Sequence, residues 1–224
     1  TLLNISKIPQ LSFIVKCLCL RLLLPSVPTH PDTCRQCPCG HIATDDYSDI
    51  GLHPLGCKQF HKGFRHGLVV SALADLTRSL GITTEVEVPV GVKRLDLRLL
   101  LGHAVHYIDV TICHPVKAKY SDVESASNAA HQRKIAKYES VIGSAGTLVP
   151  FVVESTGRMS TMAAKFIDTI CGITGPLQNT NESKAASRRF FLRRLSTVIA
   201  RCNATMVHGY IERSVLLQKH HRDE

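Results

Sequence analysis

The spacing of apolar residues changes near residue 81 from a helical to a strand-like period. Over residues 61–80, apolar side chains recur every three or four positions, which predicts an amphipathic helix. Gly81 follows as a typical helix stop. Residues 84–88 then alternate polar and apolar side chains, as a half-buried strand does. A helix followed by a strand is the first sign of a mixed α/β fold.

The remainder of the chain continues this mixture. Further strands are predicted over residues 94–101, 105–113 and 148–154, and further helices over residues 121–142, 160–171 and 184–207. The residues between the first two of these strands, Gly102 and His103, predict a hairpin turn. We therefore expect an α/β fold with one mixed sheet covered by helices.

The first 33 residues predict an amphipathic helix and a proline-rich linker. Residues 11–24 are apolar, but Lys16 and Arg21 interrupt them, which is atypical of a secretory signal or a membrane span. We expect this helix to end before Pro25 and no membrane to be a partner. Because the sequence begins with Thr1, we expect it to be part of a longer chain.

The distribution of positive charge indicates a candidate class of binding partner. The 224 residues carry a net charge of +9, and the excess is concentrated in a few segments. One such segment contains Arg188, Arg189, Arg193 and Arg194, and residues 117–137 contain another. Clustered basic residues favour a polyanion, with nucleic acid as the first candidate. A solvated basic face is the alternative.

Cysteines and histidines gather in one short segment, residues 34–57. The candidate metal ligands there are Cys34, Cys37, Cys39, His53 and Cys57. Thiolates and imidazoles at these spacings suit tetrahedral Zn²⁺, and four protein ligands would make the site structural. Cys34, Cys37, His53 and Cys57 have the most regular spacing, but five candidates compete for four places. The other cysteines are scattered, which favours a reducing compartment over a disulfide scaffold.

Two aspartates stand out in the predicted hairpin. Asp96 lies in one strand, and Asp109 lies 13 residues later among the strand-forming residues of the next. Carboxylates on neighbouring strands can converge on Mg²⁺ or Mn²⁺, which activates water for attack on a phosphodiester. The alternative is a solvent-facing Asp109 paired with a residue such as Arg98. A cysteine hydrolase is disfavoured because Cys113 and His114 would point to opposite faces of a strand.

Four segments in this order resemble the C-terminal region of non-LTR retrotransposon polyproteins. They are VKRLDLRLL, HYIDVTICHP, HQRKIAKYES and LVPFVVESTGR, and the closing FFLRRLSTVIARCNA is similar as well. The resemblance implies a restriction-like PD-(D/E)XK endonuclease with Asp96, Asp109 and either Lys134 or Lys137 in its active site. Glu87 and Glu154 are secondary candidates.

The chain departs from this family at one position, and a second feature restricts the catalytic lysine. Leu95 stands where the family has proline. Thr111 occupies the place, two residues after the second acid, where many such nucleases carry their lysine, so the lysine would come from the following helix. The resemblance also favours Cys39 as a zinc ligand, because Gly40 directly follows it, with Cys37 or Cys34 as its partner.

The resemblance also implies an organisation and a function. We expect an N-terminal helix and linker (residues 1–33), a zinc knuckle (34–60), a nuclease core (61–178) and a basic C-terminal helix and tail (179–224). The function implied is nicking of target DNA in the nucleus for an upstream reverse-transcriptase domain, with the element's RNA as a second ligand. Arg65 and His66, with the four arginines of residues 188–194, would contact nucleic acid. The alternative is an inactive, zinc-stabilised nucleic-acid-binding domain.

Overall fold

The computed structural model describes residues 37, 39–41, 53–57, 59, 62–115, 125–172 and 181–222. The chain forms two compact units, one of residues 1–65 with 199–224 and one of residues 66–198. The predicted N-terminal helix, the linker and Cys34 lie outside the described residues. The predicted four-part division of the sequence stays a prediction.

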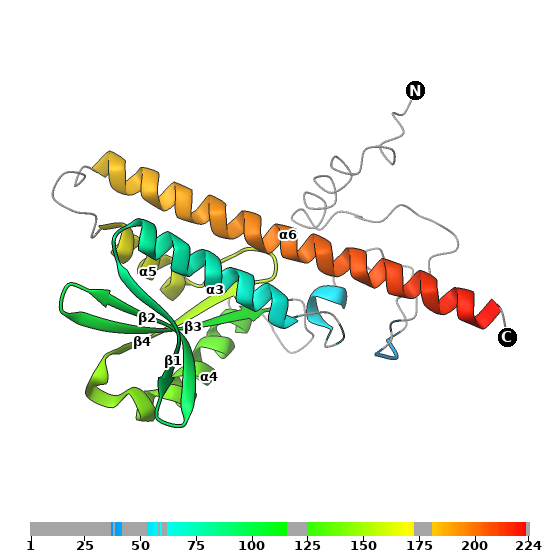
Figure 1. Cartoon of the computed structure of the whole chain (residues 1–224), viewed down its shortest axis with the longest axis horizontal. Coiled ribbons are helices and arrows are strands. Elements are labelled where there is room, and N and C mark those ends of the chain that lie inside the picture. The colour runs from blue at the N-terminus through cyan, green and yellow to red at the C-terminus, as the bar shows by residue number, and fades with distance from the viewer. Residues whose placement is uncertain are drawn as a thin grey trace. The chain divides into compact units, whose positions relative to one another are not determined.

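The larger unit contains a four-stranded mixed sheet, which confirms the α/β class (Figure 1). Its strands are β1 (Thr83–Val90), β2 (Lys93–Leu101), β3 (Ala104–Cys113) and β4 (Thr147–Glu154), in that spatial order. The first three strands run antiparallel, and β4 pairs in parallel with β3. All four strands were predicted to within two residues, because alternation and apolar runs mark them clearly.

Helices occupy the segments between and beyond the strands. They are α3 (Lys62–Ser79), α4 (Ser125–Ile142), α5 (Thr161–Gly172) and α6 (Asn181–Arg222). The last helix was predicted to end at residue 207 but continues to Arg222. Residues 208–222 contain no proline and one glycine, Gly209, and one glycine costs too little to end a long helix.

Helices α4 and α5 cover opposite faces of the sheet. On β3, Tyr107 packs against Tyr138 of α4, whereas the neighbouring His106 contacts Phe166 of α5 with ring centroids 6.1 Å apart. Successive residues of a strand point to opposite faces, so each helix covers one of them. Ile108 of β3, which has no exposed surface, shows that the sheet is buried between these layers.

None of the helices in the described segments is long and apolar enough to cross a membrane.

Two glycines should respond to alanine in opposite directions. A Cβ at Gly146 would lie 2.6 Å from the Val105 carbonyl oxygen, whereas nothing lies within 4 Å of the same position at Gly67 in α3. We expect Gly146→Ala to lower the free energy of unfolding by about 1–3 kcal/mol through overpacking. Gly67→Ala should raise it by roughly 0.5–1 kcal/mol because alanine favours the helix. Urea unfolding followed by circular dichroism measures both, and a shift of the same sign would contradict the described packing.

Candidate functional site

Asp96 and Asp109 lie at the open end of the β2–β3 pair. The ladder between these strands ends at Leu97 and Ile108, so the next opposing pair in the same register is Asp96 and Asp109. The β1–β2 ladder also skips the position of Asp96. Opposing residues of an antiparallel pair share a face of the sheet. Both carboxylates therefore belong to one place, where regular strand pairing stops.

Asp96 and His66 complete the backbone bonding of Val110 where β2 no longer does. The Val110 N–H donates to Asp96 Oδ2 at 2.6 Å. His66 Nε2 lies 3.2 Å from the same carboxylate oxygen and 3.1 Å from the Val110 carbonyl oxygen. A protonated Nε2 can donate to both oxygens. His66, predicted as a nucleic-acid contact, is thus a partner of Asp96.

A strained residue stands opposite Asp96. Among the described residues other than glycine, Glu87 is the one with a positive φ, at 56°. In the β1–β2 register Glu87 faces Asp96, at the pair that the ladder skips. Backbone strain of this kind is concentrated at functional sites. The Glu87 carboxylate itself forms an exposed ion pair with Arg94, 3.2 Å away.

Glu154, the other secondary candidate, is held by its own cation. It is buried at the end of β4 and forms an ion pair with Arg158. Thr156 also donates to its carboxylate at 3.1 Å. Because these groups already compensate its charge, Glu154 has a sufficient structural reason to be buried.

Asp109 is a buried acid with a lysine beside it. Only 3 % of the residue is exposed, and Lys134 Nζ of α4 lies 2.6 Å from its Oδ2. The approach is close but lacks hydrogen-bond geometry, so Oδ2 is a buried oxygen without an aligned donor. The solvent-facing alternative does not hold, and Arg98 pairs with Glu85 instead.

The two candidate lysines of α4 have different partners. Lys134 forms the ion pair with Asp109, whereas Lys137 Nζ donates to the Tyr138 hydroxyl at 2.7 Å. Burial, and then the neighbouring Asp109 carboxylate, raise the pKa of Tyr138 to about 12. The phenol therefore stays neutral beside the acid. Of the two lysines, Lys134 is therefore the one that pairs with Asp109.

Cys113 and His114 do not form a nucleophile and base. Burial raises the pKa of the Cys113 thiol to about 11, which keeps it protonated. His114 Nδ1 instead lies 2.7 Å from the Ser155 hydroxyl.

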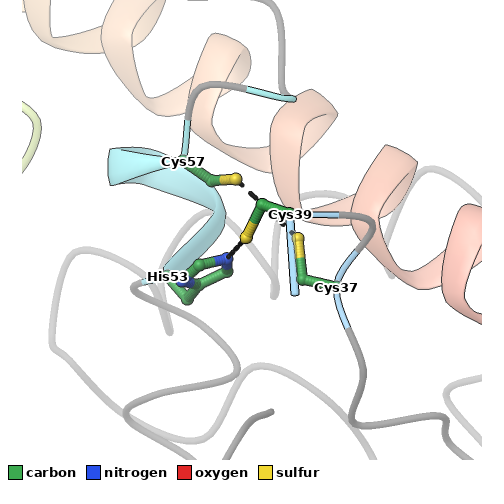
Figure 2. Close-up of side chains that lie close together, drawn as sticks. All are labelled: Cys37, Cys39, His53 and Cys57. Carbon is green, nitrogen blue, oxygen red and sulfur yellow. Dashed lines mark hydrogen bonds between the residues drawn. The ribbon is translucent and has the colours of Figure 1, made fainter. Parts of the chain in front are cut away.

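A second candidate site is the cluster of Cys37, Cys39, His53 and Cys57 (Figure 2). The sulfurs of Cys37 and Cys57 are 3.7 Å apart, and Cys39 Sγ is 3.4 Å from His53 Nε2. All four ligand atoms lie within 4.8 Å of one another. A tetrahedral ion with Zn–S of ~2.3 Å and Zn–N of ~2.0 Å separates two sulfurs by ~3.8 Å and sulfur from nitrogen by ~3.5 Å. The cluster could therefore hold a metal ion such as zinc.

Two short backbone motifs bring the four ligands together. A turn closed by the hydrogen bond from Gly40 N to Cys37 O, 2.8 Å long, places Cys37 and Cys39 side by side. Gly40 has a φ of +87°, which glycine adopts without strain. His53 and Cys57 lie one helical turn apart, joined by the bond from Cys57 N to His53 O at 2.9 Å. This places both side chains on one face.

The cluster packs against the second half of α6. Its buried apolar neighbours are Leu55, Ala204, Met206, Val207 and Tyr210. Arg65 forms two hydrogen bonds beside this cluster. Its guanidinium donates to Asn203 Oδ1 at 2.8 Å and to the Leu55 carbonyl oxygen at 3.1 Å. Arg65 is 2 % exposed and both bonds are internal, so its guanidinium supports this packing, and its contact with nucleic acid stays a prediction. Apolar positions three and four apart over residues 199–210 were the sequence signal for this packing.

The arginines at the start of α6 lie at the surface. Arg188, Arg189, Arg193 and Arg194 are all exposed. Arg188 Nε lies 2.5 Å from Asp168 Oδ1, so part of its charge is compensated. The other three leave a basic stretch at the surface of this helix.

No protein-family model matches this chain, and no curated protein is similar enough to count as a relative. The retrotransposon resemblance accordingly stays a prediction carried by the quoted segments.

We expect purified protein to contain one zinc ion per chain. Cys57→Ser should lose most of the zinc and unfold at a lower temperature, because three ligands remain in a partly buried site. Metal analysis and thermal unfolding measure the two effects. Cys171→Ser, in α5, is the matched control and should keep its zinc. Zinc-free wild-type protein, or full zinc content in Cys57→Ser, would contradict this assignment.

His66 should make stability depend on pH. Its hydrogen bond to Asp96 raises the pKa of the imidazole above the ordinary value of about 6.5. A raised pKa stabilises the fold below the unfolded value, and this contribution is lost as pH rises through the folded value. We therefore expect His66→Phe to destabilise the protein more at about pH 5.5 than at about pH 8.5.

Urea unfolding at the two pH values measures this difference. His103→Phe, in the exposed turn between β2 and β3, is the control. An equal cost of His66→Phe at both values would show that the His66–Asp96 interaction carries no charge dependence.

Proposed function

We propose that this chain contains a metal-dependent DNA endonuclease of the PD-(D/E)XK type, derived from a retrotransposon polyprotein. One observation carries the proposal: the buried Asp109 carboxylate lies beside Lys134 and opposite Asp96, at the point where two strands separate. An acid, a second acid on the next strand and a lysine are the groups that such a nuclease needs.

A structural ion pair is the simplest competing explanation of Asp109 and Lys134. Three features favour a site over that explanation. Asp109 Oδ2 is buried without an aligned hydrogen bond. Asp96 is unpaired in both strand ladders. The residue opposite it, Glu87, has a strained backbone. A purely structural ion pair requires neither the unpaired position of Asp96 nor the strained backbone of Glu87.

The residues suit a hard divalent cation. Mg²⁺ binds through one or two carboxylates and keeps several waters, so Asp96 and Asp109 are a sufficient protein contribution. Among the described residues, the Cys/His cluster is the one group of three or more candidate metal ligands, so water and phosphate oxygens would supply the other ligands of an ion at the two aspartates. When bound, such an ion lowers the pKa of a water and stabilises charge on the phosphodiester.

The chain's own residues complete the chemistry. Asp109 would hold the ion from the centre of the sheet, and Asp96 from the open strand end. Lys134, whose ammonium is already beside Asp109, would orient the attacking water or neutralise charge on the pentacovalent phosphorus. His66 Nε2 contacts both the Asp96 carboxylate and the Val110 carbonyl oxygen, and these two contacts would fix the orientation of Asp96.

The remainder of the chain would hold nucleic acid. The exposed Arg189, Arg193 and Arg194 suit backbone phosphates, whose contacts are independent of sequence and sensitive to salt. The Cys/His cluster would bind zinc for a structural purpose, because all four ligands are protein groups. The substrate would be DNA, with the element's RNA a second ligand. In this proposal the nick serves an upstream reverse-transcriptase domain, and the protein acts in the nucleus.

An inactive nucleic-acid-binding domain is the second candidate. Leu95 and Thr111 favour it, because both depart from the commonest nuclease pattern. The two candidates differ in cleavage and agree in binding, so one assay separates them.

We expect purified protein to nick supercoiled plasmid when Mg²⁺ or Mn²⁺ is added. Asp109→Asn should reduce the nicking rate at least about 100-fold while DNA binding remains, because a neutral amide is a poor metal ligand. Gel separation of supercoiled and open-circular plasmid measures the rate. The metal-free arm omits divalent cation, since a chelator would also strip zinc.

Asp75→Asn is the matched control. Asp75 is an exposed acid of α3 that pairs with Arg78 on the surface, and its variant should nick like wild type. Binding without nicking in any metal would leave the inactive domain as the function. Nicking by Asp109→Asn at the wild-type rate would place the chemistry elsewhere.

A further inference from the structure

Three lysine ammonium groups surround the ring of Tyr138. Lys93 Nζ lies 5.6 Å from the ring centroid, Lys134 Nζ 5.7 Å and Lys137 Nζ 4.4 Å. Lys93 comes from the start of β2, whereas the other two lysines come from α4. Cations near an aromatic face are attracted by its quadrupole, but each such contact is worth only ~0.5–2 kcal/mol. The ring gathers the charges without neutralising them.

Only one of the three lysines has an acidic partner. Lys134 pairs with Asp109. Lys93 donates instead to the backbone carbonyl of Lys137, and Lys137 donates to the Tyr138 hydroxyl. In the described part of the chain, neither Lys93 nor Lys137 forms an ion pair. Two uncompensated cations are thus held close together by neutral groups, which is unfavourable unless an anion joins them.

This cationic group adjoins the candidate catalytic acids. Tyr138 is buried and lies beside Asp109, and its hydroxyl is 3.4 Å from the carbonyl oxygen of Arg94 in β2. Lys137 is exposed and Lys93 is half-buried, so both can be reached from solvent. An anion bound there would lie next to the Asp96–Asp109 pair, without displacing Lys134 from Asp109.

We propose that Lys93 and Lys137, gathered around Tyr138, form a phosphate subsite for the DNA strand beside the cleaved bond. The substrate in this proposal rests on the proposed nuclease function, but the phosphate site itself does not need cleavage. A phosphodiester fits the group because it carries one negative charge and several acceptor oxygens, which two separate ammonium groups can share. Lys93 and Lys137 act by binding substrate and Lys134 acts in the chemistry.

The salt dependence of DNA binding tests the proposal. Each phosphate contact contributes about 0.9 to the slope of log K against log salt for duplex DNA. Because the two lysines share one phosphate, we expect the Lys93→Met/Lys137→Met double variant to reduce that slope by about 0.9 and each single variant to reduce it by less. Fluorescence anisotropy of a labelled 20-base-pair duplex, with no added divalent cation, measures it. In the nicking assay the same variants should raise KM more than they lower kcat.

Two further variants separate phosphate binding from structural support. Lys165→Met removes an exposed lysine of α5 and should leave the slope unchanged. The double arginine variant of Lys93 and Lys137 keeps both charges and should restore the slope. Thermal unfolding of each variant identifies any that fails to fold. A double methionine variant that folds and keeps the wild-type slope overturns the proposal, as does a slope lost equally in Lys165→Met.

Inorganic phosphate separates the two sources of the anion. Competition by phosphate in wild type but not in the double methionine variant, with unchanged duplex binding, would assign the site to free phosphate and overturn its DNA role. If the variants reduce the slope but the wild-type protein never nicks DNA, the nuclease proposal is contradicted and the phosphate subsite is supported. Absence of any DNA binding by wild type would overturn both.

Discussion

The carboxylate of Asp109 lies inside the third strand of the sheet, where an ionised group is stable only beside a compensating charge. Lys134 supplies that charge from α4. This pairing fixes where α4 can lie, because its lysine must reach the centre of β3. The same helix then brings Tyr138 against Tyr107 and Lys137 to the Tyr138 ring, where Lys93 of β2 also lies. One buried charge thus organises the sheet, the helix and the basic surface beside them.

The end of the β2–β3 ladder is the second constraint. Val110 needs partners for its N–H and its carbonyl where β2 no longer pairs, and Asp96 and His66 provide them. An open strand end would ordinarily be a weak point. Here it is closed by an acid that keeps acceptor capacity, since a carboxylate can accept several bonds. The fold therefore keeps a carboxylate at a place that regular strand pairing would have filled.

The sequence predicted the elements well because their signals are local. Alternation marks β1, and short apolar runs mark β3 and β4, while the Cys and His spacings indicated the Cys/His cluster. The contacts of individual side chains depended on tertiary packing. Nothing in the sequence shows that Arg65 is buried against Asn203, 138 residues later. Likewise Lys134 and Lys137 share a helix, and only the approach of α4 to β3 gives them different partners.

The position of a bound divalent cation would show whether Asp96 and Asp109 form a metal site. Crystals of the protein with a short duplex and Mn²⁺ would give an anomalous difference peak at each metal, with zinc separated by its own absorption edge. If the two aspartates form a metal site, a manganese peak will lie within about 2.0–2.4 Å of oxygens from both Asp96 and Asp109. A well-occupied manganese site elsewhere, with Asp109 still held by Lys134 alone, would contradict a metal site at the two aspartates.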